Sequence, residues 1–312
     1  MRKLLSTMLV AMIVLSIVTP AMGNYREDFV YSGHYLFMRQ TMRLYPTLAV
    51  VGAAASVMSG ASMGFIGSPY ADSALPEWDF DVIGGVGLTN ADHMGVQGFR
   101  FEADMTTLHA GINASKDRML LGGIIHYEDI EGKGTNGNGL DSQNSGLLLM
   151  PGYRLLTQEE DGVNLEINGI LDLSYSRHTQ IPSTPSAWYI RPGLRTSASL
   201  ATKVGMFQSS YTYCQLRNID GDNDQFTGKS SVSTHAMAFD YLFLITEQVV
   251  GNIGISHITF NDMPTGMDDE FTDLNLRLGS DVTERLKVSA GYFQAIDGRE
   301  TDGFNLSVVW AM

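Results

Sequence analysis

Two side chains near the middle of the chain have types and a spacing that could support nucleophilic catalysis. Ser176 supplies a hydroxyl and His178, two residues further on, supplies a base. Hydrolases build an activated nucleophile from such a pair, but a third group must orient the base. The sequence places no acid or amide to orient His178, so a histidine at the rim of a sheet is the simpler interpretation. We therefore expect no enzyme, and a rim hydrolase remains the least favoured alternative.

A second candidate for chemistry is the acidic triplet Asp220, Asp222 and Asp224, whose alternating carboxylates could hold a hard cation such as calcium. An EF-hand loop requires Gly at its sixth position and Glu at its twelfth, where this chain has Gln225 and Ser231. Six of the histidines show no metal-ligand spacing either: His34, His93, His109, His126, His235 and His257. The sequence predicts a solvated acidic loop, no metal and no cofactor.

The elements around these residues are strand-like runs separated by turn signals. Twelve such runs follow one another: 78–89, 99–113, 119–128, 145–156, 163–177, 187–200, 204–216, 235–245, 249–260, 271–279, 286–296 and 303–312. Twelve is an even number, as single-chain bacterial outer-membrane barrels require. The fold expected is all-β, a closed antiparallel transmembrane barrel of about twelve strands.

The fifth and sixth runs test this hypothesis, because they carry charged residues at alternate positions. Leu171 and Leu173 fall on one face of the fifth run, and Glu166 and Asp172 fall on the other. Charges at such positions suit a wet lumen rather than a packed core. A soluble β-sandwich with one solvated face stays open on periodicity alone. The residues expected to line the lumen are Glu166, Asp172, Arg191, Arg195, Asp240, Asp273, Arg277 and Lys287.

Connection lengths favour the membrane barrel over the sandwich. Short connections follow the even-numbered runs: 114–118, 157–162, 201–203, 246–248 and 280–285. Long ones follow the third, fifth, seventh and ninth runs: 129–144, 178–186, 217–234 and 261–270. Short turns at one end and long loops at the other are typical of outer-membrane barrels. Aromatic residues at the run ends would form interfacial girdles: Tyr127, Tyr153, Tyr175, Trp188, Phe260, Phe271, Tyr292 and Trp310.

The first 23 residues have the layout of a secretory signal peptide. Arg2 and Lys3 precede an apolar run from Leu4 to Val18, and small residues follow. That run is too short for a spanning helix, so we expect cleavage after Gly23 and export of the chain. The mature chain is acidic, with a formal net charge of -14 for the whole sequence, which argues against nucleic acid as a partner.

Residues 24–77 form a separate N-terminal segment ahead of the barrel at 78–312. The stretch from Leu44 to Ala71 has no charged side chain and many small residues, which suit passage through a narrow space. We expect a helical or extended plug in the lumen, or a linker, without a sizeable passenger. A periplasmic segment, a spanning helix and extra strands remain alternatives. In the lumen, Arg39 and Arg43 would lie near carboxylates such as Glu166 or Asp172.

The last run alternates without a fault between apolar and small or polar side chains. Its apolar face consists of Phe304, Leu306, Val308, Trp310 and Met312. A soluble protein rarely ends on such an exposed strand, because an open edge recruits other chains. The run resembles the C-terminal signal by which bacterial outer-membrane barrels are recognised for assembly. This resemblance implies the barrel assembly machinery and periplasmic chaperones as partners, together with outer-membrane lipid.

Two stretches near the start of the barrel resemble the β-domain of autotransporters. One is 104–113, with an Ala-x-Gly-like step, and the next is 116–127, a Leu-Leu-Gly strand that ends in Tyr127. A Gly-rich acidic loop at 131–141 follows, and Gly152-Tyr153-Arg154-Leu155 and Pro192-Gly193-Leu194 also fit. The resemblance implies a translocator barrel that provides a pore or membrane anchor. A small-solute porin-like channel and a structural or adhesive barrel remain alternatives, and we expect a monomer after Sec-type export to the bacterial outer membrane.

Overall fold

The structure is a computed structural model that describes residues 79–96, 99–134, 139–156, 163–178, 187–202, 205–219, 231–246, 249–261, 270–283, 285–297 and 300–311. The predictions for the signal peptide at 1–23, for the segment 24–77 and for the acidic triplet at 220–224 lie outside the described residues. Among the described residues, no helix is long and apolar enough to cross a membrane.

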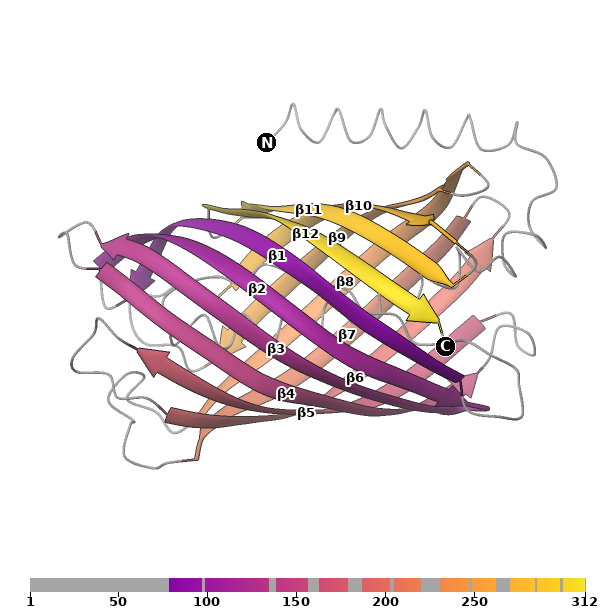
Figure 1. Cartoon of the computed structure of the whole chain (residues 1–312), viewed down its shortest axis with the longest axis horizontal. Coiled ribbons are helices and arrows are strands. Elements are labelled where there is room, and N and C mark those ends of the chain that lie inside the picture. Colours follow the sequence, from indigo (N-terminus) through magenta and orange to yellow (C-terminus); the bar gives the residue numbers. More distant parts are fainter. Residues whose placement is uncertain are drawn as a thin grey trace.

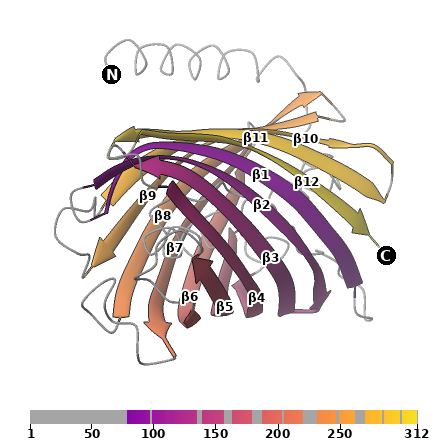
Figure 2. The ribbon, with the colours of Figure 1, turned by 60° about the vertical axis from the view of Figure 1, so that its left-hand side comes forward.

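Twelve antiparallel strands close into one barrel, as the sequence predicted (Figure 1). The strands are β1 (Asp79–Val96), β2 (Phe99–Lys116), β3 (Met119–Gly134), β4 (Gly139–Leu156), β5 (Val163–His178), β6 (Ala187–Thr202), β7 (Gly205–Asn218), β8 (Ser231–Thr246), β9 (Val249–Asn261), β10 (Glu270–Asp281), β11 (Leu286–Asp297) and β12 (Glu300–Ala311). Each strand pairs with its neighbours in sequence, and Figure 2 shows them curving around an enclosed interior.

The barrel closes where the last strand meets the first. The ladder between β1 and β12 runs from Asp81 opposite Ala311 to Asp92 opposite Glu300, and β11 occupies the other edge of β12. The apolar terminal strand therefore has no open edge. Closure is the arrangement that removes the edge-to-edge aggregation hazard of such a strand.

The two faces of the sheet separate by polarity. In β12, Phe304, Leu306, Val308 and Trp310 point outward and are exposed, whereas the inward Asn305 is buried. The same alternation holds in β5, where Leu171 and Leu173 are exposed and Asp172 is buried. An apolar exterior around a polar interior is the reverse of a soluble protein and is what a barrel in lipid requires.

The strands at the long-loop end extend further than the sequence suggested. β3 continues to Gly134 and β4 begins at Gly139, so most of the loop expected at 129–144 is strand. β8 likewise begins at Ser231, within the loop expected at 217–234. Apolar alternation fades there because outward positions such as Asp129, Glu131 and Ser233 are polar, while backbone pairing between neighbours continues. The alternation and the turn signals therefore ended β3 too early and began β4 and β8 too late.

One of the predicted girdle aromatics is wrong. Phe260 in β9 is 3% exposed and points into the barrel, because it shares the inward face with Ser256 and Ile258. Five others are on the outer face, at least partly exposed: Tyr127, Tyr153, Trp188, Tyr292 and Trp310. Tyr175 is also outward and packs against Trp188 in a tilted arrangement, at a ring-centroid distance of 5.2 Å.

Candidate functional site: a lumenal polar network on β3–β6

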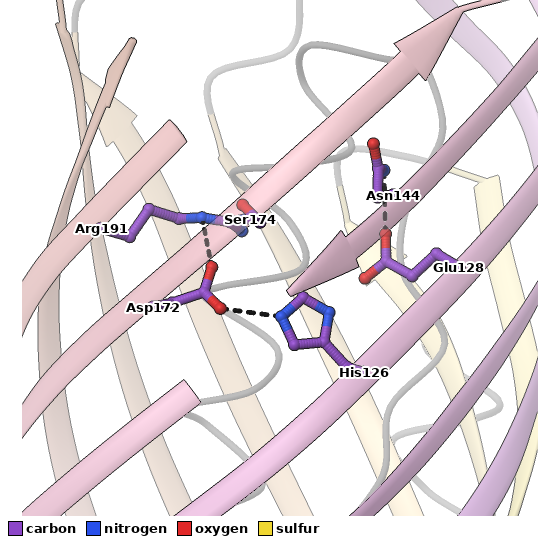
Figure 3. A network of polar contacts seen from close by, with 6 residues as sticks. All are labelled: His126, Glu128, Asn144, Asp172, Ser174 and Arg191. Atoms are coloured by element: carbon purple, nitrogen blue, oxygen red, sulfur yellow. Dashed lines mark hydrogen bonds and ion pairs between the residues drawn. The ribbon is translucent and has the colours of Figure 1, made fainter. Parts of the chain in front are cut away.

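Three charged or ionisable side chains meet on the inner wall of the barrel (Figure 3). His126 on β3 donates a hydrogen bond from Nε2 to Asp172 Oδ1 on β5, at 2.7 Å. On the other side, Arg191 Nε on β6 lies 2.8 Å from Asp172 Oδ2. Each carboxylate oxygen of Asp172 thus has its own nitrogen partner. Charged side chains can be buried when they are paired, because the attraction between the partners offsets the loss of their hydration.

The strand register explains how these groups come together. Asp172 lies directly opposite Arg191, so this pair needs only two neighbouring strands. His126 lies opposite Gly146 on β4, and Gly146 lies opposite Ser174 on β5. Because Gly146 has no side chain, the imidazole of His126 can cross β4 and reach Asp172. A Cβ at Gly146 would lie 2.5 Å from His126 Nε2.

A second polar row lies beside the first. Ser176 donates to Asn144 Oδ1, and Asn144 Nδ2 donates to Glu128 Oε2 at 3.1 Å. Ser174 connects the neighbouring strands by accepting a hydrogen bond from Arg191. We define the lumenal network as His126, Glu128, Asn144, Asp172, Ser174, Ser176 and Arg191. All of its members are buried.

Other lumenal charges are also matched across strands. Arg154 Nε lies 3.5 Å from Glu166 Oε1. Asp240 accepts a hydrogen bond from Asn252 at 3.4 Å and interacts electrostatically with arginines on β10 and β6. Carboxylates and guanidinium groups are therefore interspersed around the wall. Such pairing balances the charge locally, where these partners meet.

The structure places the predicted lumen residues as follows. Seven are buried on the inner face, at 6% exposure or less: Glu166, Asp172, Arg191, Arg195, Asp240, Asp273 and Arg277. Lys287 lies in β11 opposite Val309, and its side chain is not among those that the structure describes. The residues are spread over several strands, and only Asp172 and Arg191 belong to the lumenal network. Glu166 pairs with Arg154 instead.

Sequence reasoning missed His126 and Glu128. Both lie on the inward face of β3, an even number of residues away from the buried Leu120 and Ile124. The alternation of inward and outward positions, applied to the third run as it was to the fifth, would have found them. Their contacts across β4 could not be found in this way, because those contacts depend on register.

The proposed hydrolase pair does not gain support from the geometry. Ser176 directs its hydroxyl to Asn144, and the side chain of His178 lies outside the description. Within the described strands and turns, no group of three or more His, Cys, Asp or Glu side chains could hold a metal ion. What the site offers is a set of oriented hydrogen-bond donors and acceptors on one wall.

Gly146→Ala tests whether the glycine permits the bridge. The added methyl group should push His126 away from Asp172 and crowd the backbone oxygen of Leu173, 2.9 Å from the new Cβ. We expect a loss of about 1–3 kcal/mol in the free energy of unfolding. Urea titration in detergent micelles measures this loss. In Gly146→Ala with His126→Ala, the loss relative to His126→Ala alone should be smaller. An equal loss in the two backgrounds would contradict the role given to Gly146.

Comparisons with known proteins give the fold a wider context. The transport unit of the autotransporter AIDA-I from Escherichia coli is similar, with a TM-score of 0.54, 11% identity, and coverage of 86% of this chain and 99% of that chain. The COG4313 outer membrane channel from Pseudomonas putida F1 has a TM-score of 0.53 and 13% identity, and the match covers 78% of this chain and 99% of that chain. The translocator domain of the autotransporter NalP from Neisseria meningitidis has a TM-score of 0.52 and 12% identity, and the match covers 74% of this chain and 88% of that chain.

No family model matches the sequence, and no curated protein matches it. The structural similarities cover nearly the full length of two of these barrels but involve few identical residues. They therefore show a shared fold. The chain is a β-barrel of the outer-membrane type, and the predicted resemblance to autotransporter translocator domains is confirmed as a resemblance of fold.

Proposed function

We propose that this protein acts as a pore in the bacterial outer membrane. The observation that carries the proposal is the separation of the two faces, with buried charged side chains inside and exposed apolar side chains outside. Polar side chains on a barrel interior support passage of hydrated solutes. Matched charges such as Asp172 with Arg191 would favour solutes of modest charge over strongly anionic ones.

A second candidate is translocation of a polypeptide. It is favoured by the similarity to the AIDA-I transport unit and to the NalP translocator domain, each with a TM-score above 0.5. In either case the chain would be exported by a Sec-type pathway, handled by periplasmic chaperones and inserted as a monomer by the barrel assembly machinery. The outward face of β12, with Phe304 and Trp310, would be the part recognised for assembly. No catalytic step is part of this proposal.

Planar-bilayer recording of the refolded chain tests the pore. Wild-type protein should give discrete conductance steps, and deletion of 39–67 should raise the size of each step because the sequence predicts that this segment occupies the lumen. Folding of both proteins is checked by their resistance to unfolding in cold SDS. An absence of steps from folded protein would overturn the pore. Conductance steps of equal size from the two proteins would support the pore function but show that residues 39–67 do not plug the pore.

A further inference from the structure

Glu128 is the lumenal carboxylate with the least complete set of partners in the network. Its Oε2 accepts a hydrogen bond from Asn144, at 3.1 Å. Its Oε1 is buried and accepts no hydrogen bond from any described residue. Ser176 holds the Asn144 amide in the orientation that presents Nδ2 to Glu128. The carboxylate is therefore held through one oxygen, and its other oxygen is buried without a hydrogen-bond partner among the described residues.

His126 presents a second available atom on the same strand and face, two residues before Glu128 (Figure 3). Its Nε2 is engaged by Asp172, and its buried Nδ1 has no hydrogen-bond partner among the described side chains and backbone. Because the Asp172 carboxylate can only accept, the proton of a neutral ring resides on Nε2. Nδ1 is then an acceptor, like Glu128 Oε1.

The charges around these two atoms are unequal. The network holds two carboxylates, Glu128 and Asp172, and one guanidinium, Arg191. Arg191 lies 2.8 Å from Asp172 and also donates to Ser174, and its charge acts on Glu128 as well. Glu166, by comparison, has Arg154 at 3.5 Å. With the His126 ring neutral, the network thus carries one negative charge in excess, and it holds two acceptor atoms without a hydrogen-bond partner among the described residues.

We propose that Glu128 and His126 form a binding site in the lumen for the primary ammonium group of an organic cation, a proposal that rests on the pore function. An ammonium group carries one positive charge and several N–H donors, which match one carboxylate and one imidazole acceptor. An anion would be repelled by Glu128. A divalent metal is not favoured, because the described residues offer no third ligand here. Glu128 is the charged contact, and Asn144 and Ser176 are positioning residues.

Single-channel recording in KCl tests the site with two probes of similar size. n-Propylammonium should lower the potassium conductance in a saturable way, because it carries both the charge and the N–H donors. Tetramethylammonium has the charge but no donors, so it should need a concentration about tenfold higher for the same reduction. This comparison uses only the wild-type protein. Equal reduction by both cations would overturn the proposal.

Glu128→Gln provides the matching variant, because the amide oxygen can still accept from Asn144 while the charge is lost. The half-blocking concentration of propylammonium should rise about tenfold. The control is Glu166→Gln, which removes a carboxylate that already has Arg154 beside it and should leave the block unchanged. An unchanged block in Glu128→Gln would overturn the site while leaving the pore intact. Absence of any wild-type conductance would instead overturn the pore itself, and the site with it.

Discussion

Asp172→Ala is expected to destabilise the barrel by about 3–5 kcal/mol. Asp172 is fully buried, with one oxygen 2.7 Å from His126 Nε2 and the other 2.8 Å from Arg191 Nε. Removing the carboxylate leaves a buried guanidinium without its counter-ion, and the cost of that unmatched charge dominates the effect. Alternation alone would suggest a mild effect for any change at this position, because the inner face is wet. Equilibrium unfolding by guanidinium chloride in detergent micelles, followed by tryptophan fluorescence, measures the difference.

The control for this experiment removes both charges. Asp172→Ala combined with Arg191→Met should recover part of the lost stability, because the guanidinium no longer lacks a partner. The coupling energy between the two sites then isolates their pairwise interaction. Additive losses at the two positions would show that the 2.8 Å contact contributes little and that this ion pair does not stabilise the barrel.

Leu171→Arg should cost about 2–4 kcal/mol, because it places a guanidinium against lipid near the middle of the membrane. Leu171 is 40% exposed on the outer face of β5, next to the exposed Leu149 on β4. No carboxylate is within the apolar band of β5 to receive the charge, since Leu173 and Ile167 share its outward face. Unfolding in phosphatidylcholine vesicles is the appropriate measurement, because the cost comes from the hydrocarbon.

Tyr175→Arg is the matched control, further along the same face. The chain already has an exposed Arg177 two residues beyond it, which marks the approach to the interface. A cation near the interface should cost only about 0–1 kcal/mol. Similar losses at positions 171 and 175 would mean that the depth assigned to the outer face of β5 is wrong.

Much of the fold could be predicted from the sequence, because a barrel wall is a local pattern repeated. Side chains alternate with period two along a strand, so each run reports its own faces without knowledge of its neighbours. The faces of β5 and β6 and the outward set in β12 were predicted in this way, and the structure places them so from Phe304 to Trp310, with Met312 outside the described residues. Strand ends were less predictable. β1 continues to Val96 past a register shift between Ala91 and Met94, and β3 continues to Gly134 where its outward positions are polar.

The parts of the site that depend on register could only be decided by the tertiary structure. Sequence alternation placed Asp172 and Arg191 on the lumenal face, but a shift of one residue between strands would have separated them. The contact between His126 and Asp172 spans 46 residues and crosses β4 at Gly146. It depends on three strands being aligned and on a glycine at the crossing point. Alternation therefore determined which residues face the lumen, and the alignment of neighbouring strands decided which of them meet.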